Sequence, residues 1–405
     1  MRRIRKIFFL RLKYRLALFR IRRAYGKRKI VVAFSVSNIS KWKCQSLYDL
    51  LSKSDKYKPV LLVYPSGEDL RCAPKIIQQK LKDIVRFFQS KEMNVVNIWD
   101  NDTQRCNIPI SYQPDILFYQ QPWDSPIFPF PAHFASRALT FYIPYYLMNN
   151  FDQDIEFGQL MHKQIFGYIV LNEEVANFFE SKLDKRYYAG KCLGLGHTMI
   201  DLLTTKSTTS NKQYVIYAPH FSFPVEGKHR LLTYSSFLEN GRLILEFAQQ
   251  HSELNWVFKP HPLLYQELKA TGVWSEEEVD AYYDAWKELG VYCNTSDYIE
   301  YFQDSIAMIT DCGSFMTEYS CMDKPLIRLY YHKENLPPNP MLEQLYQTFY
   351  YANNNEELIA LLSEILCERK DINRDTRHKE ISKLGLNKSE AATNILNYLD
   401  TLLNK

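Results

Sequence analysis

Residues 307–319 read AMITDCGSFMTEY. Four residues typical of a buried strand (307–310) lead through Asp311, Cys312, Gly313 and Ser314 into a helical pattern that runs to residue 321. A strand that passes through a short turn into a helix is the repeating unit of α/β proteins with parallel sheets. This stretch therefore predicts an α/β layer fold, and it places polar groups at the carboxyl end of a strand.

The same alternation extends over most of the chain. We expect strands at residues 29–37, 59–64, 94–98, 115–119, 214–218, 255–259, 290–293 and 307–310, with helices at 44–53, 76–88, 173–183, 241–250, 275–289 and 296–302. The polar stretch TTKSTTSNKQ separates two such halves, which predicts two Rossmann-like, doubly wound domains facing a cleft. The expected organisation is a basic segment 1–28, a first domain 29–203, a linker 204–213, a second domain 214–380 and a C-terminal helix 381–405.

Positive charge is concentrated at the N-terminus. Residues 1–30 hold 13 Lys and Arg and no acid, whereas the remaining chain holds 37 basic and 46 acidic residues, although the total charge is only +4. Wound as a helix, this segment places Arg2, Lys6, Lys13 and Arg20 on one face. Its apolar residues fall on the other face: Ile4, Ile7, Phe8, Tyr14, Leu18 and Ile21. A basic amphipathic helix predicts docking on an anionic membrane surface, with a solvated tail or an RNA-binding arm as the alternatives.

Composition excludes several classes of protein. With 46% hydrophobic and 24% charged residues the chain is neither disordered nor fibrous. Its eight cysteines include no CxxC pair, so we expect no zinc ribbon, no disulfide framework and a reducing, cytoplasmic location. The longest uncharged stretch, residues 138–151, is too short to cross a bilayer, and no segment resembles a secretory signal. The mildly acidic body gives no reason to expect binding to nucleic acid.

Polar residues follow three strands of the second half. His220 follows the strand 214–218, His261 lies between two prolines after 255–259, and Gly313-Ser314 follows 307–310. The helix that begins there has free N–H groups and a positive dipole end, which suit an anionic phosphate. Such a site needs no metal or other cofactor. The triplets Asp100-Asn101-Asp102 and Asp152-Gln153-Asp154 leave a metal-dependent transferase open as an alternative.

Several motifs together resemble those of the CDP-glycerol glycerophosphotransferases, which build teichoic acids and some capsules. The matching segments are Tyr217-Ala218-Pro219, Lys259-Pro260-His261-Pro262, residues 310–318, Lys324-Pro325-Leu326-Ile327 and, as the family's turn at the domain junction, residues 193–201. The resemblance implies a GT-B-like fold, a CDP-activated donor in the second domain, an acceptor in the first, and attachment to the membrane surface. Within these motifs His261 matches the family's donor-phosphate histidine, Ser314 the second serine of the Thr-Asp-Tyr-Ser-Ser motif and Glu318 its trailing acid. We expect the full donor-binding set to be Lys259, His261, Asp311, Gly313, Ser314, Thr317 and Glu318.

The chain departs from the family pattern at informative positions. Gly313 replaces the first serine of the family's Thr-Asp-Tyr-Ser-Ser motif, Cys312 replaces the tyrosine, and His220 stands where a threonine is usual. The Trp-His-Gly-Thr segment, which holds the catalytic base in the polymerases, has no counterpart. The sequence Tyr-Ile-Pro-Tyr, which ends at Tyr145, lies at roughly that place.

These features predict a transferase that moves glycerol phosphate or ribitol phosphate from a CDP-linked donor to a hydroxyl of a lipid-linked or polymeric acceptor. We expect His220, His261 and Asp124 in catalysis, and Trp123, Asp124 and Tyr145 on the acceptor side. One alternative is a GT-B glycosyltransferase that uses a nucleotide sugar. Another is an assembly partner that binds donor or lipid without catalysis. The C-terminal stretch 387–403 predicts a helix that, by analogy with other GT-B proteins, crosses back to the first domain.

Overall fold

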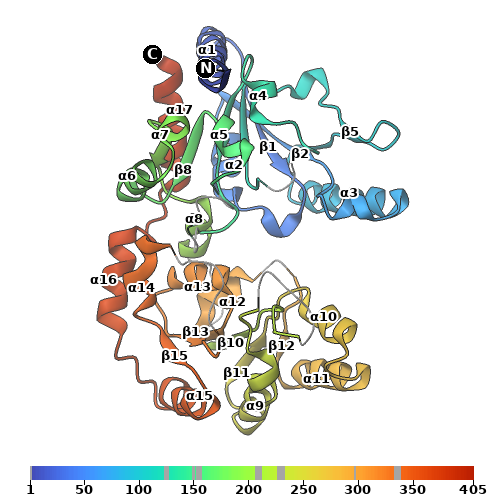
Figure 1. The fold of residues 1–405 in the computed structure, drawn as a ribbon, viewed down its shortest axis with the longest axis vertical. Coiled ribbons are helices and arrows are strands. Elements are labelled where there is room, and N and C mark those ends of the chain that lie inside the picture. Colours follow the sequence, from blue (N-terminus) through green and yellow to red (C-terminus); the bar gives the residue numbers. More distant parts are fainter. Residues whose placement is uncertain are drawn as a thin grey trace. The chain divides into compact units, whose positions relative to one another are not determined.

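The computed structural model describes residues 2–122, 127–147, 151, 157–205, 212–225, 233–295, 298–332 and 339–405, with side chains described from residue 7 onward. The chain forms two compact units (Figure 1). The first consists of Met1–Tyr145, Asp152–Leu202 and Ser389–Lys405, and the second of Tyr146–Phe151 and Leu203–Lys388. Most of the expected linker, residues 206–211, lies outside the described residues.

The first unit is built on a seven-stranded parallel sheet in the order β3-β2-β1-β6-β7-β8-β9. Its strands are β1 (Ile30–Val36), β2 (Tyr57–Val63), β3 (Val95–Asn97), β6 (Ile116–Tyr119), β7 (Leu139–Tyr142), β8 (Gly167–Val170) and β9 (Cys192–Gly194). A short antiparallel pair, β4 (Trp99–Asp100) and β5 (Arg105–Cys106), follows β3. The strands between β3 and β9 are almost fully buried, which explains their continuous apolar sequences, whereas β3 and β9 at the two edges of the sheet are partly exposed.

Helices cover both faces of this sheet. One apolar core unites the sheet with α1 (Arg2–Ala24), α2 (Gln45–Ser52), α3 (Pro74–Gln89) and α17 (Ala391–Asn404). The remaining helices are α4 (Pro131–Phe134), α5 (Leu160–Gln164), α6 (Glu173–Lys182), α7 (Lys185–Tyr188) and α8 (Thr198–Thr204). The last helix of the chain therefore packs within the first unit, beside α1 and α2 (Figure 1).

The basic N-terminal segment is a helix, as expected, but its apolar residues divide between two faces. Tyr14, Ala17 and Ile21 are buried in the core of the first unit, and the Tyr14 hydroxyl donates to the carbonyl of Gln164 at 2.8 Å. Phe8, by contrast, is exposed. The single apolar face inferred from the sequence is therefore wrong, because part of it forms the domain core. No helix in the described residues is both long and apolar enough to span a membrane.

The second unit contains a six-stranded parallel sheet in the order β12-β11-β10-β13-β14-β15. Its strands are β10 (Tyr214–Ala218), β11 (Asn255–Phe258), β12 (Val291–Tyr292), β13 (Ser305–Thr310), β14 (Leu326–Leu329) and β15 (Tyr350–Ala352). Its helices are α9 (Phe237–Gln250), α10 (Leu264–Thr271), α11 (Glu276–Leu289), α12 (Ile299–Asp304), α13 (Gly313–Ser320), α14 (Glu343–Tyr346), α15 (Asn355–Leu362) and α16 (Arg374–Leu384).

Helix α11 illustrates how local sequence determines these elements. Ser275 and Glu278 form a reciprocal capping box at its start, with backbone N–H groups donating to both side chains. Its buried residues recur at helical spacing, and Trp286 stacks on Phe258 of β11 with ring centroids 4.9 Å apart. The α/β architecture with two Rossmann-like sheets, predicted from the sequence, is confirmed.

Candidate functional site

The strand order of the second unit determines where a ligand would bind. Chain order within the sheet is 3-2-1-4-5-6, with β10 at the centre between β11 and β13. Ligands of such sheets bind beyond the carboxyl ends of the strands, where the chain order reverses. That reversal lies between β10 and β13. The three motifs singled out in the sequence follow the adjacent strands β10, β11 and β13. They therefore meet beyond the carboxyl ends of these strands, which form one edge of the sheet.

Two imidazoles lie side by side at this edge. The ring centroids of His220 and His261 are 4.7 Å apart, and Phe221 packs against both rings. Backbone hydrogen bonds hold their segments together: the N–H of Lys259 donates to the carbonyl of Tyr217 at 2.8 Å, and that of His261 donates to Pro219 at 2.9 Å. The residues that follow β10 and β11 therefore lie close together in the structure.

Both rings use Nδ1 as an acceptor. The backbone N–H of Ser222 donates to Nδ1 of His220 at 3.3 Å, and that of Leu263 donates to Nδ1 of His261 at 3.2 Å. A neutral imidazole that accepts at Nδ1 carries its proton on Nε2. No partner of either Nε2 is recorded among the described residues, so each ring has an N–H available for a ligand oxygen.

Both rings are neutral near pH 7. Burial lowers the pKa of His261 to about 4, with a smaller contribution from Lys259. Burial also lowers the pKa of His220 well below its ordinary value, and the neighbouring His261 adds to this shift. The pair therefore offers neutral N–H donors rather than two positive charges.

Asp311 positions this edge. Its carboxylate accepts the backbone N–H of His220 at 2.7 Å, the Ser235 hydroxyl at 2.7 Å and the backbone N–H of Ser236 at 3.2 Å. Burial raises the pKa of Asp311 to about 6, against the opposing effect of these three donors. The carboxylate thus fixes the segment after β10 to the start of α9.

Among the described residues, no side-chain oxygen is recorded as a cap of the N-terminus of α13. Its N-cap residue is Cys312, which makes no side-chain capping hydrogen bond, and the Ser314 hydroxyl approaches the Cys312 Sγ at 3.4 Å. Gly313 is buried and Ser314 is half-buried. Because Asp311 is engaged elsewhere, the first N–H groups of α13 receive no carboxylate cap from it. This arrangement suits an anionic oxygen of a ligand.

The other predicted donor-site residues make contacts inside the second unit. Glu318 is buried and hydrogen-bonds the Tyr298 hydroxyl. The Lys259 ammonium lies 5.8 Å from the centroid of the Tyr298 ring. The Thr317 hydroxyl, fully buried, pairs with the Tyr346 hydroxyl at 3.1 Å. Thr317 thus packs within the unit, whereas Lys259 supplies a buried positive charge beside the strand end.

Acceptor-side predictions fall in the first unit. Trp123 and Asp124 lie outside the described residues. Tyr145 is half-buried, with the Lys41 ammonium 5.5 Å from its ring centroid, and its backbone N–H donates to the carbonyl of Gln120 at 3.0 Å. The chain order of this sheet also reverses, between β1 and β6. Tyr145 and Gln120 therefore lie near the equivalent edge of the first sheet.

The turn at residues 193–201 has a structural role. Asp201 accepts the backbone N–H groups of Ala391 and Ala392 at 2.9 and 2.8 Å, so it caps α17. Gly196 has φ +94°, and an added Cβ would lie 2.9 Å from the Ala391 Cβ. His197 accepts the Met199 N–H at Nδ1 and pairs with the Pro144 carbonyl through Nε2 at 2.6 Å. Both ring nitrogens of His197 are therefore used within the fold.

Sequence reasoning missed three contributors to the site. Ser222 and Ser235 contact His220 and Asp311, and Tyr234 stacks on His220 with centroids 5.1 Å apart. Ser235 and Ser236 stand directly before a helical pattern, and serine at that position is a signal for a helix N-terminus. Arg328 was also missed: it is buried in β14, in register with Thr310 of β13, and its recorded contacts are with the aromatic side chains of Tyr330, Tyr346 and Tyr351. A charged residue inside an apolar strand is the signal that could have found it.

The metal-dependent alternative gains no support within the described residues. No group of three or more His, Cys, Asp or Glu there is arranged to hold a metal ion. Asp100 accepts the backbone N–H groups of Asp102 and Thr103, at 2.9 and 3.3 Å, in the turn between β4 and β5. The triplet at residues 152–154 lies outside the described part of the chain.

Comparison with known proteins identifies the fold. No protein-family model and no curated protein matches the chain. Solved structures do match. A histidine variant of the wall teichoic acid polymerase TagF has a TM-score of 0.59 at 13% identity, covering 99% of this chain and 96% of that one. The UDP-GlcNAc 2-epimerase from Neisseria meningitidis, bound to UDP-GlcNAc, has a TM-score of 0.58 at 13% identity, covering 92% and 100%.

A third structure, the S. aureus MnaA complex with UDP, has a TM-score of 0.56 at 12% identity and covers 92% of this chain and 96% of that one. Together with the two sheets, these likenesses define the class of the molecule as a GT-B fold. At these identities they establish the fold alone.

Proposed function

We propose that this protein is a transferase that moves glycerol phosphate or ribitol phosphate from a CDP-linked donor to a hydroxyl of a lipid-linked or polymeric acceptor, in the synthesis of a teichoic acid-like or capsule polymer. One observation carries the proposal. His220, His261 and the uncapped start of α13 follow adjacent strands at the chain reversal of the second sheet. N–H donors at such an edge suit a diphosphate.

In the proposed reaction, the acceptor oxygen attacks the β-phosphorus of the donor. The bond from that phosphorus to the bridging oxygen breaks, and CMP leaves with the bridging oxygen. The Nε2–H groups of His220 and His261, with the first N–H groups of α13 and the Ser314 hydroxyl, stabilise the charge that grows on the phosphate oxygens. Lys259 contributes a positive charge nearby.

The geometry favours the phosphate-binding role of His220 over a role as general base. A base at Nε2 would need an unprotonated nitrogen there, but the Ser222 N–H already occupies Nδ1 as a donor. The acceptor proton then goes to a group on the acceptor side, for which Asp124 is the proposal from the sequence. Trp123 and Tyr145 are proposed to line that side.

A second candidate is a GT-B glycosyltransferase that uses a nucleotide sugar. Two structural neighbours were solved with UDP or UDP-GlcNAc, which supports testing UDP-linked donors in parallel. In this case the same N–H groups would bind the diphosphate of the sugar nucleotide.

Donor turnover distinguishes these candidates. The purified chain is incubated with labelled CDP-glycerol, CDP-ribitol or UDP-GlcNAc and a polyol-phosphate acceptor, and release of CMP or UDP is measured. Release of CMP from the CDP substrates alone supports the first proposal, and release of UDP alone supports the second. Tight nucleotide binding without turnover of any donor would contradict both and favour a non-catalytic assembly partner.

We also propose that α1 docks the protein on an anionic membrane surface. Five large apolar side chains of this helix are exposed on the side opposite its buried residues: Phe8, Phe9, Leu12, Leu16 and Phe19. Exposed basic residues flank this row: Arg11, Arg15, Lys13 and Arg20. Apolar residues with flanking Lys and Arg are what an interfacial helix needs. Arg2 and Lys6, predicted to contribute, lie in the part of α1 whose side chains are not described.

A further inference from the structure

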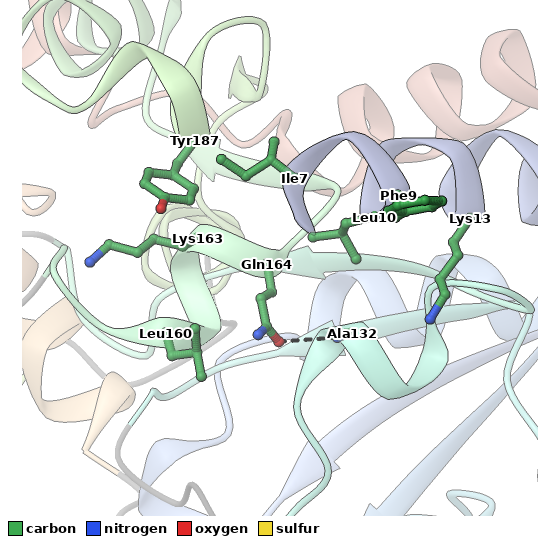
Figure 2. Close-up of a pocket in the computed structure, with 9 residues that line it drawn as sticks. All are labelled: Ile7, Phe9, Leu10, Lys13, Ala132, Leu160, Lys163, Gln164 and Tyr187. Carbon is green, nitrogen blue, oxygen red and sulfur yellow. Dashed lines mark hydrogen bonds between the residues drawn. The ribbon is translucent and has the colours of Figure 1, made fainter. Parts of the chain in front are cut away.

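A pocket of about 480 Å³ lies in the first unit between α1 and the helices α4, α5 and α7 (Figure 2). Ile7, Leu10 and Leu160 supply aliphatic walls. Lys163 and Tyr187 lie at one end of the pocket and Lys13 at the other, as Figure 2 shows. An aliphatic chamber with a cation at each end is complementary to an amphiphile that carries negative charge.

The Lys163 end has an excess of positive charge. The Lys163 ammonium donates to the Gly158 carbonyl at 2.6 Å and lies 5.8 Å from the Tyr187 ring centroid, and no carboxylate partner of it is recorded among the described residues. Arg11 and Lys191 lie close by: the Arg11 guanidinium donates to the Arg186 carbonyl at 3.3 Å, and the Lys191 ammonium donates to the Lys163 carbonyl at 3.3 Å.

The pKa of Lys191 is lowered by burial and by the nearby positive charge. Burial lowers it to about 8, and repulsion from Arg11 adds to the shift. Of the acids near these cations, Asp184 is paired with Arg186 at 2.5 Å, and the Glu180 carboxylate accepts the backbone N–H groups of Lys191 and Cys192 at 3.1 Å each. A phosphate at this end would therefore meet the Lys163 ammonium, whose recorded hydrogen bond is to a carbonyl and not to a carboxylate.

The pocket is continuous with the exposed apolar row of α1. Phe9 belongs to both, since it is 57% exposed and also lines the pocket. Leu160, on the opposite wall, is 52% exposed. A lipid molecule could therefore enter from a bilayer on which α1 lies.

We propose that this pocket binds one anionic phospholipid molecule, with its phosphate at the Lys163 and Tyr187 end and one acyl chain between Ile7, Leu10 and Leu160. All of these residues belong to the first unit. The site thus goes beyond the proposed transferase activity and does not depend on which donor is used. It would turn a surface contact of α1 into recognition of an individual lipid.

A water-soluble lipid tests the proposal without a membrane. The full chain is titrated with dihexanoyl phosphatidylglycerol below its micelle concentration, by calorimetry, and with dihexanoyl phosphatidylcholine and glycerol 3-phosphate as comparisons. We expect saturable binding of one phosphatidylglycerol molecule, at least about tenfold tighter than the zwitterionic lipid. Equal affinity for the two lipids, no saturable binding, or equal affinity for glycerol 3-phosphate would each overturn the proposal.

Two variants locate the site. Leu160→Trp fills the apolar chamber and Lys163→Gln removes the phosphate partner, so each should weaken phosphatidylglycerol binding about tenfold. The matched controls are Leu70→Trp, at another exposed leucine of the first unit, and Lys182→Gln, at an exposed lysine of α6. Since Leu160 is half exposed, the fold should survive, which an unchanged melting temperature checks. Equal loss in a variant and its control would place the lipid elsewhere and contradict the proposal.

Discussion

At the scale of single residues, the tautomer of His261 determines what it can do. Its Nδ1 accepts a backbone N–H, so its Nε2–H is a hydrogen-bond donor and not a base. A glutamine places an amide N–H near the position of Nε2, whereas an alanine offers none. We therefore expect His261→Ala to lower CMP release from CDP-glycerol about 100-fold or more, and His261→Gln to restore a substantial part of it.

A general-base role for His261 predicts a different result. If His261 were a general base, glutamine could not take up a proton, and both variants would lose activity equally. Binding of unreactive CDP by calorimetry separates the two roles further. A donor to phosphate affects affinity for CDP, whereas a base affects only the rate of turnover.

Asp311 gives a prediction that does not depend on catalysis. Its pKa of about 6 lies above that of an unfolded aspartate, so its contribution to stability is complete at low pH and is lost as pH rises through 6. Ser235→Ala removes a hydroxyl donor to the carboxylate, and it should raise this pKa further and lower the free energy of unfolding near pH 7 by about 1.5–3 kcal/mol.

Carboxyl carbon NMR titration and urea unfolding measure the two effects of Ser235→Ala. Ser236→Ala is the control for the pKa, because its backbone N–H, which it keeps, is the group that contacts Asp311. An unchanged Asp311 pKa in Ser235→Ala would mean that the hydroxyl is not a significant partner of the carboxylate.

At the scale of elements, the start of α17 depends on a residue far away in sequence. Asp201 caps it with two backbone hydrogen bonds and also accepts the Ser46 hydroxyl at 2.9 Å, whereas the adjacent Glu390 makes no capping bond. We expect Asp201→Ala to lower the free energy of unfolding of the first unit by about 2–3 kcal/mol. Glu390→Ala should change it by less than about 0.5 kcal/mol. Urea unfolding measures both, and similar losses would contradict the capping role.

The accuracy with which the sequence predicts an element differs between β10 and α1. Strand β10 was predicted at its observed bounds, because a short run of apolar β-formers between polar residues has few other interpretations. The faces of α1 were misassigned, because two apolar rows on opposite sides of one helix give a weak periodic signal. Only the packed structure tells which row belongs to the core.

The site was predictable to the same limited degree. His220 and His261 were found because they follow strands, a position that local pattern gives directly. Their tautomers depend on the backbone N–H groups of Ser222 and Leu263, each two residues further along the chain. The contact of Asp311 with Ser235, by contrast, is set by tertiary packing. Hydrogen-bond partners separated by 76 residues along the chain leave no periodic pattern in the sequence.

At the scale of the whole molecule, α1 joins the basic segment to the domain core. A tail that only binds membranes could be removed without loss of stability. Here removal of residues 1–26 would take Tyr14, Ala17 and Ile21 out of the core of the first unit. Each lost buried side chain of this kind costs on the order of 1–3 kcal/mol, so we expect the truncated chain to unfold or aggregate. Loss of membrane binding on truncation therefore says nothing about docking.

Substitutions on the exposed row separate the two roles of α1. Leu12→Ser, Leu16→Ser and Phe19→Ser combined should leave the urea midpoint nearly unchanged, because all three side chains are exposed. The same substitutions should reduce binding to phosphatidylglycerol vesicles in a flotation assay at least about tenfold, because they remove most of the exposed apolar row. Wild-type binding should weaken with added salt, since Arg11, Arg15 and Arg20 supply the attraction. The control Ile110→Ser removes an exposed apolar side chain far from α1 along the chain. Vesicle binding that survives the triple substitution, in a protein that remains folded, would show that α1 does not dock the molecule on the bilayer.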